Sequence, residues 1–332
     1  MEMFDITVVG AGPVGLYAGF YAGMKGLSVH ILDVAEAIGG QPMAIYPEKK
    51  IYDIAGVPEI SGGELAENLQ AQLRRVPHTL SLGQKVEKIE QRADGNFLLK
   101  TSAAEFLSRS VLLTTGNGLI TPRKIGVDGE DAAHDSGRLS YNVSVLEEYR
   151  EKTVVILGGG DSALDWALML EPIAKEVHVV HRRDKFRAHA KTVADVAESS
   201  VNLHTPFTVS ALTESGLSLQ KVKSDERLEL SADKVLVSYG SITSVLDVMD
   251  ALDVTRNNKI PVSQEMASNI SGIFAAGDVV EYREAPRVKV PLISVGFGEA
   301  VTAVSAIARQ IDFGHKLTSG HSSTLFEKEE GK

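Results

Sequence analysis

The sequence predicts an α/β protein with two domains, each built around a parallel β-sheet. A short apolar strand, a glycine-rich turn, a helix and a second strand follow one another twice, with the turns at residues 10–15 and 158–163. The turns have the forms G-x-G-x-x-G and G-x-G-x-x-A. The chain of 332 residues is also long for one core, since a domain typically has roughly 150 residues. This pattern is typical of two Rossmann-like domains that each bind a dinucleotide.

Composition excludes several classes of protein. A net charge of −10 argues against general nucleic-acid binding, and 43% hydrophobic residues are typical of a soluble globular protein. No apolar run reaches the roughly 20 residues that a membrane span needs, and the N-terminus lacks the basic region of a signal peptide. We therefore expect a cytoplasmic protein without a membrane partner. The absence of cysteine excludes disulfides, thiolate metal sites and a cysteine nucleophile, and we expect no metal site.

The first dinucleotide motif begins at the N-terminus. Residues 4–9 (FDITVV) predict a buried strand, residues 14–24 a helix, and residues 28–32 a second strand. The order strand, turn, helix and strand is much stronger evidence for a dinucleotide site than the glycine spacing alone. The alternative is a structural glycine turn in an ordinary α/β domain.

Each marked residue of this motif has a physical role. Gly10 allows the tight turn, Gly12 lets backbone N–H groups approach a pyrophosphate, and Gly15 lets the helix pack closely on the strand. Pro13 suits the first helical turn, where its missing N–H costs nothing. Asp33, at the end of the second strand, can accept hydrogen bonds from the free hydroxyl groups of a ribose.

The segment after the first motif carries a second candidate for ligand contact. Residues 38–49 contain paired glycines and two prolines, which predict an irregular loop. This loop follows a strand of the first motif, where ligands of such sheets lie. Gln41 can donate and accept hydrogen bonds, and Tyr46 offers a flat aromatic face. The alternative is a surface loop with a packed tyrosine.

Further elements lie between the two motifs. Residues 61–76 predict an amphipathic helix because leucines recur at four-residue spacing. Residues 80–115 alternate between apolar and polar side chains and predict a small β-meander that ends in an apolar strand. A sharp glycine turn follows at residues 116–118, where backbone can again meet a ligand, and residues 121–123 predict the start of a crossover segment.

The second dinucleotide motif repeats the first with an alanine at the close-packing place. Residues 153–157 (TVVIL) predict a buried strand, which leads into a turn and a helix that ends before Pro172. A further strand covers residues 177–180. We expect the turn and the first helical residues to bind a second dinucleotide. The residues concerned are Gly158, Gly160, Asp161 and Ser162.

The second motif ends in basic residues. No carboxylate occupies the place that Asp33 has in the first motif, and the segment there carries His181, Arg182, Arg183 and Arg187 instead. Arginine binds phosphate bidentately, whereas a carboxylate repels it. The first site therefore suits a ribose with free hydroxyl groups and the second a ribose with a 2′-phosphate, which indicates FAD at the first and NADPH at the second. The alternative is a solvated basic face.

The last third of the chain contains one more ligand candidate. Residues 205–240 again alternate and end in an apolar strand, and residues 273–278 predict a strand that ends in Gly-Asp. Asp278 is either a ligand contact or a helix N-cap or turn acid, and His321 taken alone is a surface histidine of the tail. Residues 296–300 predict the opening of a helix that continues to residue 311.

These motifs resemble the two-dinucleotide-domain flavoprotein reductases of the thioredoxin reductase type. The resemblance covers nearly the whole chain and implies an NADP(H) domain (119–248) inserted in a discontinuous FAD domain (1–118 and 249–332). Thioredoxin reductase needs a C-x-x-C pair, which this chain lacks. Three stretches are instead similar to the thioredoxin-reductase-like ferredoxin–NADP reductases of Gram-positive and green sulfur bacteria. They are residues 46–49 (YPEK), 158–167 (GGGDSALDWA) and 321–326 (HSSTLF).

The resemblance implies roles for residues that the motifs alone leave open. Tyr46 would stack on one face of the isoalloxazine, His321 would cover the other, and Asp278 would bind the ribityl chain. The helix opening at Gly298 would point its N-terminus at the flavin. The full set of implied FAD contacts comprises Gly10, Gly12, Pro13, Gly15, Asp33, Gly40, Gln41, Tyr46, Val86, Gly116, Ile120, Asp278, His321, Ser323 and Thr324.

The implied reaction has two halves. NADPH passes a hydride to FAD, and single electrons then pass to or from ferredoxin or flavodoxin, without a catalytic side-chain acid or base. The resemblance also implies a homodimer and a rotation of the two domains about hinges near residues 118 and 249. Three alternatives stay open: a reductase of an external small disulfide, an NADPH oxidase or diaphorase, and a flavin-bearing module without enzymatic activity.

Overall fold

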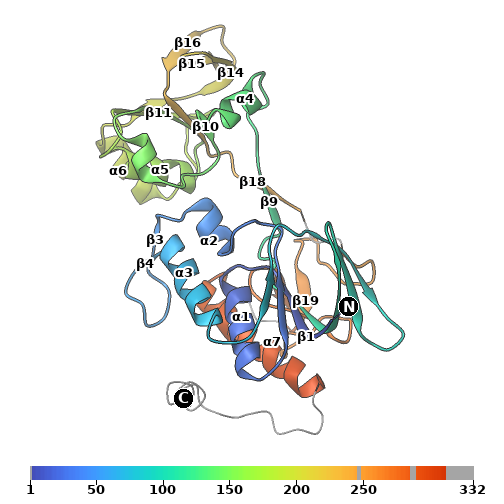
Figure 1. Ribbon diagram of the computed structural model, residues 1–332. Coiled ribbons are helices and arrows are strands. Elements are labelled where there is room, and N and C mark those ends of the chain that lie inside the picture. The colour runs from blue at the N-terminus through green and yellow to red at the C-terminus, as the bar shows by residue number, and fades with distance from the viewer. Residues whose placement is uncertain (1, 245–247, 285–288, 312–332) are drawn as a thin grey trace. The chain divides into compact units, whose positions relative to one another are not determined.

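The computed structural model describes residues 2–244, 248–284 and 289–311. The chain divides into two compact units (Figure 1). The first unit consists of Met1–Leu119 and Thr243–Lys332, and the second unit is Ile120–Ile242. Each unit contains helices and a sheet with parallel strands, so the predicted two-domain α/β fold, one domain inserted in the other, is confirmed.

The first unit is built on a seven-stranded sheet with the order β5-β2-β1-β8-β7-β6, in which β20 also pairs with β8. The strands are β1 (Met3–Val9), β2 (Val29–Leu32), β5 (Thr79–Ser81), β6 (Val86–Gln91), β7 (Phe97–Thr101), β8 (Glu105–Leu113) and β20 (Ile273–Ala275). Strands β5, β2, β1, β8 and β20 are parallel, whereas β6, β7 and β8 form an antiparallel meander. The predicted meander therefore shares β8 with the nucleotide-type sheet.

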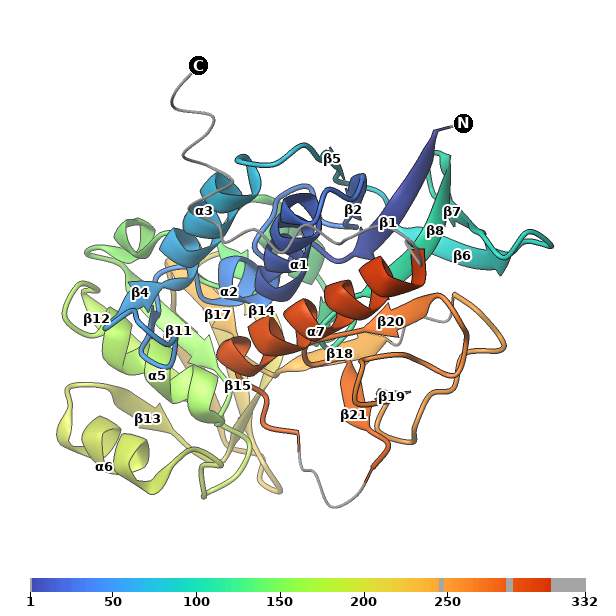
Figure 2. The same cartoon turned by 90° about the horizontal axis from the view of Figure 1, so that it is seen from below.

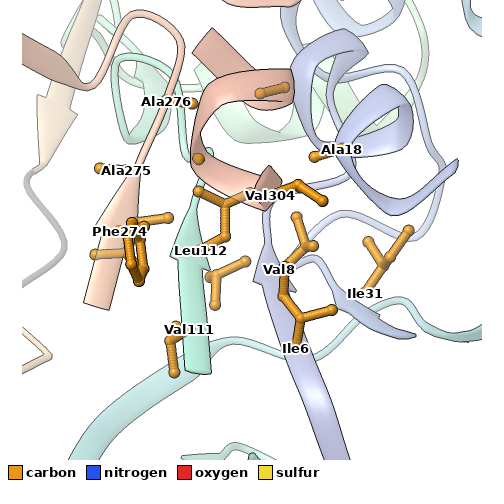
Figure 3. Packing of buried hydrophobic residues seen from close by; sticks show 14 of the residues in the cluster. Ile6, Val8, Ala18, Ile31, Val111, Leu112, Phe274, Ala275, Ala276 and Val304 are labelled. Carbon is orange, nitrogen blue, oxygen red and sulfur yellow. The ribbon is translucent and has the colours of Figure 1, made fainter. Parts of the chain in front are cut away.

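Four helices belong to the described part of the first unit. They are α1 (Pro13–Met24), α2 (Gly40–Ile45), α3 (Gly62–Leu73) and α7 (Ile293–Ile311). Helix α1 packs against both α3 and α7, and Figure 2 shows α7 beside α1. Figure 3 shows the core between sheet and helices, where Val8, Leu112 and Val304 pack together. The apolar residues of β1 and the small residues of α7 thus account for the close approach of helix and sheet.

Short strand pairs complete the first unit. Strand β3 (Lys50–Ile51) pairs with β4 (Ile60–Ser61), and β19 (Ile260–Val262) pairs with β21 (Val280–Tyr282). The chain passes between the units through β9 (Leu119–Pro122) and β18 (Ser241–Ser244), which pair with each other. The crossover predicted at residues 121–123 is therefore partly a strand.

Helix α3 begins at a capping box. The backbone N–H of Glu64 donates to Ser61 Oγ at 3.2 Å, and the Glu64 carboxylate accepts from the Ser61 N–H at 2.8 Å. The leucines at four-residue spacing are buried, so the predicted amphipathic helix is confirmed. They are Leu65, Leu69 and Leu73.

Replacing Ser61 by alanine is expected to lower the free energy of unfolding by about 1 kcal/mol, the usual effect of losing an N-cap hydroxyl. Urea denaturation followed by circular dichroism measures the loss. Glu64→Gln is the control, because glutamine at the third helical position still completes a capping box. An equal loss in both variants contradicts this account of the helix start.

The second unit is built on a five-stranded parallel sheet with the order β10-β17-β11-β12-β13. The strands are β10 (Leu139–Ser140), β11 (Thr153–Leu157), β12 (Glu176–Val180), β13 (Asn202–His204) and β17 (Lys234–Val237). The helices are α4 (Glu130–Asp135), η1 (Leu146–Tyr149), α5 (Asp161–Leu170) and α6 (Ala190–Glu198). An antiparallel sheet of β14 (Phe207–Thr213), β15 (Gly216–Lys221) and β16 (Arg227–Ser231) follows β13 in the chain.

Two expectations about local structure are wrong. Residues 40–45 form the short helix α2 rather than irregular loop, and α7 begins at Ile293 rather than at Gly298. Gly296 lies inside α7, where a Cβ would come 2.5 Å from Val14 of α1. This glycine permits close helix packing instead of starting the helix. Within the described ranges, no helix is long and apolar enough to cross a membrane.

Candidate functional site

In the first unit, three turns that sequence analysis marks as ligand candidates meet at one edge of the sheet. They follow β1, β8 and β20, which are neighbours. The backbone N–H of Thr114 donates to the Val9 carbonyl at 2.8 Å, and the N–H of Ala276 donates to the Leu113 carbonyl at 3.0 Å. These bonds bring the ends of the three strands level. Ligands of open α/β sheets lie at this edge, beyond the carboxyl ends of the strands.

The glycine-rich turn after β1 forms a cradle without side chains. A Cβ at Gly15 would lie 1.8 Å from the Gly10 carbonyl oxygen, so only glycine permits this packing. Gly40 has φ +57°, and a Cβ there would lie 2.8 Å from Gly12 Cα. Pro13 is the first residue of α1. The two backbones approach closely beside the start of α1, which fits a pyrophosphate held by backbone N–H groups.

Asp33 lies beside the glycine-rich turn after β1 and stabilises it through a hydrogen bond. One carboxylate oxygen accepts the N–H of Ala11 at 2.6 Å, and the other accepts the N–H of Ala35 at 2.8 Å. A carboxylate has about four lone-pair positions, so both oxygens retain capacity for a ribose hydroxyl. The half-buried Asp33 therefore fits its predicted contact.

Tyr46 and Asp278 lie near one another although they are far apart in the sequence. Burial raises the pKa of the Tyr46 phenol, and the negative charges of Asp278 and Asp53 raise it further. Tyr46 follows α2, and Gln41 lies within that helix. The fold thus brings the tyrosine, proposed to face the flavin ring, and the aspartate, proposed to bind the ribityl chain, to one place.

Two charged residues that sequence analysis does not identify hold the Gly277–Asp278 turn. Glu299 accepts the N–H of Gly277 at 2.8 Å. Lys259 Nζ donates to the Asp278 carbonyl at 2.5 Å and to Asn117 Oδ1 at 2.8 Å. A lone carboxylate within the apolar sequence of α7 is a signal that could have identified Glu299, whereas nothing in the sequence around Lys259 marks it.

The remaining predicted FAD contacts lie in different parts of the chain, not all of which the structure describes. Gly116 lies in the turn after β8, whereas the Val86 side chain is buried in the core of the first unit. Any contact from Val86 would therefore come from its backbone. Ile120 lies in β9, but its side chain is outside the described part of the structure. The tail residues His321, Ser323 and Thr324 lie outside the described residues.

The glycine-rich turn of the second unit is open where its ligand would lie. Gly160 is the N-cap of α5, and a Cβ there would have no neighbour within 4 Å. Asp161 and Ser162 are exposed in the first turn of the helix, and the Asp161 carboxylate accepts the N–H of His189 at 2.8 Å. Gly158 links the end of β11 to this turn. The second turn therefore also leaves room for a dinucleotide.

Three predicted phosphate-binding arginines follow β12 and are exposed. Within the described ranges, no ion pair involves Arg182, Arg183 or Arg187. The backbone N–H of Arg187 donates to the Gly159 carbonyl at 2.7 Å, which ties this segment to the glycine-rich turn. The guanidinium groups are thus available near the turn, as a 2′-phosphate site requires.

His181 lies against the same turn. Its ring packs on Gly159 and stacks on Phe186, with 5.4 Å between the ring centroids. Burial lowers the pKa of His181, and the positive charges of the neighbouring arginines lower it further. A neutral imidazole at pH 7 contributes packing and hydrogen bonding rather than charge, so the charge of this segment comes from its arginines.

The fold and the two glycine-rich turns, after β1 and after β11, define a two-domain dinucleotide-binding protein. The chain belongs to the family described as "Pyridine nucleotide-disulphide oxidoreductase", whose model matches residues 4–306. It is therefore an oxidoreductase, as the motifs predict.

Curated relatives confirm the resemblance stated from the motifs. The chain is 49% identical to "Ferredoxin--NADP reductase" of Lactococcus lactis subsp. cremoris (strain MG1363), over 98% of this chain and 100% of the relative. It is 44% identical to "Ferredoxin--NADP reductase 2" of Bacillus subtilis (strain 168), over 98% of both chains.

Solved structures support the fold. Thioredoxin reductase of T. acidophilum matches with a TM-score of 0.75 at 23% identity, over 94% of this chain and 99% of that chain. Thioredoxin reductase of Lactococcus lactis (FR conformation) matches with a TM-score of 0.74 at 24% identity, over 94% of this chain and 100% of that chain. The thioredoxin reductase-like fold predicted from the motifs is therefore confirmed.

Proposed function

We propose that this protein is an FAD-dependent ferredoxin–NADP(+) reductase, which moves electrons between NADP(H) and ferredoxin or flavodoxin. The observation that carries the proposal is the difference between the two dinucleotide motifs. Asp33, a carboxylate, follows the second strand of the first motif, whereas arginines without carboxylate partners in the described ranges follow the second strand of the second motif. The family and the names of the relatives support FAD and NADP(H) as the cofactors.

The first unit supplies the FAD site in this proposal. Backbone N–H groups of the glycine-rich turn and the start of α1 hold the pyrophosphate, and Asp33 accepts hydrogen bonds from the ribose. Tyr46 covers one face of the flavin ring, and Asp278 binds the ribityl chain. When bound, FAD supplies the exchange between two-electron chemistry with NADP(H) and one-electron chemistry with the protein partner. The domain boundaries proposed are 1–118 with 249–332 for FAD and 119–248 for NADP(H).

The second unit supplies the NADP(H) site. The open turn at Gly160 accepts the pyrophosphate at the start of α5, and Arg182 and Arg183 pair with the 2′-phosphate. Among the described residues we assign no general acid or base to either site, so these residues bind and orient the cofactors. The absence of cysteine from the whole chain argues against electron transfer through an internal dithiol. We further propose a cytoplasmic homodimer, following the motif resemblance.

Ferredoxin-dependent cytochrome c reduction tests the proposed activity. NADPH is the donor, and the rate is compared with and without added ferredoxin. We expect a large stimulation that falls with rising salt, because electrostatic attraction steers such partners together. No stimulation, with the bound flavin still bleached by NADPH, contradicts ferredoxin as the partner. Flavodoxin, a small disulfide, quinone or oxygen would then be the acceptor to test.

A further inference from the structure

The Gly277–Asp278 dipeptide is held at both ends by charged side chains. At its first end, the N–H of Gly277 donates to one carboxylate oxygen of Glu299 at 2.8 Å. At its other end, the Asp278 carbonyl accepts from Lys259 Nζ at 2.5 Å. The dipeptide comes one residue after β20, at the edge of the sheet where the glycine-rich turn after β1 also lies. Its orientation is therefore fixed by Glu299 of α7 and by Lys259, which directly precedes β19.

Glu299 belongs to a buried charge network. Its side chain is 5% exposed, and that of Lys289, its ion-pair partner, is 13% exposed. The carboxylate oxygen that does not bind Gly277 accepts from Lys289 Nζ and from the Tyr282 hydroxyl. A well-packed apolar pair usually stabilises a fold at least as well as a buried ion pair. The geometric constraint on Gly277 is therefore a better explanation for this network than stability.

Lys259 connects two of the cradle turns. Its Nζ also donates to Asn117 Oδ1 at 2.8 Å. Asn117 lies in the glycine turn after β8, and Asp278 lies in the turn after β20. Two turns that come from distant parts of the sequence are thus joined through one ammonium group.

We propose that Glu299 and Lys259 are positioning residues for FAD, which act by orienting Asp278. This inference rests on the proposed function, in which Asp278 binds the ribityl chain. Neither residue needs to touch the cofactor. Glu299 fixes the direction of the Gly277 N–H, and Lys259 fixes the following carbonyl, so the Asp278 side chain leaves a backbone that is held from both ends.

Glu299→Gln tests the role of the carboxylate. Gly277 and Lys289 donate to different oxygens of the Glu299 carboxylate, and glutamine can place an oxygen at only one of these two positions. We expect the dissociation constant for FAD to rise about tenfold, the usual effect of losing one charge-assisted hydrogen bond. The measurement is a titration of the full-length apoprotein with FAD, followed by quenching of flavin fluorescence.

A double-mutant cycle separates positioning from general stability. If Glu299 acts through Asp278, then Glu299→Gln has little further effect on FAD binding in an Asp278→Ala background. Additive effects overturn the proposal, as does unchanged FAD affinity in the single variant Glu299→Gln. Lys259→Met is a second test variant, and it leaves the buried Glu299–Lys289 pair intact. It is expected to weaken FAD binding and to be non-additive with Asp278→Ala, and additivity there also contradicts the proposal.

Glu265→Gln is the matched control. Glu265 pairs with Arg309 of α7, as Glu299 pairs with Lys289, but the side chains of this pair are more than half exposed, at 66% for Glu265 and 56% for Arg309. We expect its FAD affinity to equal that of the unmodified protein. Failure of the unmodified protein itself to bind FAD would contradict the proposed function. Binding by the unmodified protein together with additive variants would overturn only the positioning role.

Discussion

Replacing Gly12 by alanine is expected to raise the dissociation constant for FAD by about 100-fold while the protein stays folded. Gly12 has extended backbone angles, φ −74° and ψ −179°, which alanine also adopts. A Cβ there would meet only Gly40 Cα, at an ordinary distance of 3.7 Å. The added methyl group fills the cradle itself. Two backbone hydrogen bonds to a phosphate, at about 1.5 kcal/mol each, correspond to roughly a 100-fold change.

Two glycine variants control for this prediction. Gly160→Ala places a methyl group in the equivalent turn of the second unit, so it is expected to weaken NADPH binding and leave FAD binding unchanged. Gly15→Ala is expected to destabilise the fold, because its Cβ would collide with the Gly10 carbonyl oxygen at 1.8 Å. Fluorescence titration and circular dichroism together distinguish these outcomes. An unchanged FAD affinity in Gly12→Ala would place the dinucleotide elsewhere.

Local sequence determines the parts of the fold that sequence analysis predicts correctly. The strands and helices of the dinucleotide motifs are specified by short apolar runs and by glycines whose packing admits no side chain. The strand predicted at residues 153–157 is observed with the same bounds, as β11. The position of Asp33 directly after β2 could likewise be predicted, because it follows from the strand that precedes it, whereas its contact with a ribose stays a prediction.

Tertiary packing determines the elements that sequence analysis misses. Helix α2 follows Gly39 and contains Gly40 and Pro42, local signals that oppose a helix. Pro42 is buried, and a Cβ at Gly62 would lie 2.6 Å from its carbonyl oxygen, so close packing with the start of α3 accompanies this short helix. The early start of α7 has a similar origin, since Gly296 packs on Val14.

The positioning residues were missed for a different reason. Lys259 contacts Asn117, which lies far away in the chain, and no spacing rule connects the two. Glu299 is the exception that composition could have marked, because a carboxylate among small apolar residues of a buried helix must have a partner. Such contacts can be identified only from the three-dimensional structure, in which the turns that they join lie together.

Replacing Arg182 and Arg183 together by alanine is expected to raise KM for NADPH at least about 100-fold, since each charge-assisted hydrogen bond to a phosphate is worth about 1.5–3 kcal/mol. KM for NADH, which lacks the 2′-phosphate, is expected to change little. Both arginines are exposed, and no ion pair involves them in the described part of the second unit. Their removal therefore leaves no buried carboxylate without a partner, and the fold is expected to be retained.

Steady-state kinetics with both nucleotides measures the effect. The matched control is Arg150→Ala with Arg227→Ala, which removes two exposed arginines of the same unit, where Arg150 pairs with Glu147 and Arg227 bonds Gln220. This control changes the net charge equally, so a general electrostatic effect would appear in both double variants. Equal rises in KM for NADPH and NADH after changing Arg182 and Arg183 would contradict recognition of the 2′-phosphate. The arginines would then form a solvated basic face, and the preference for NADPH would need another source in the second unit.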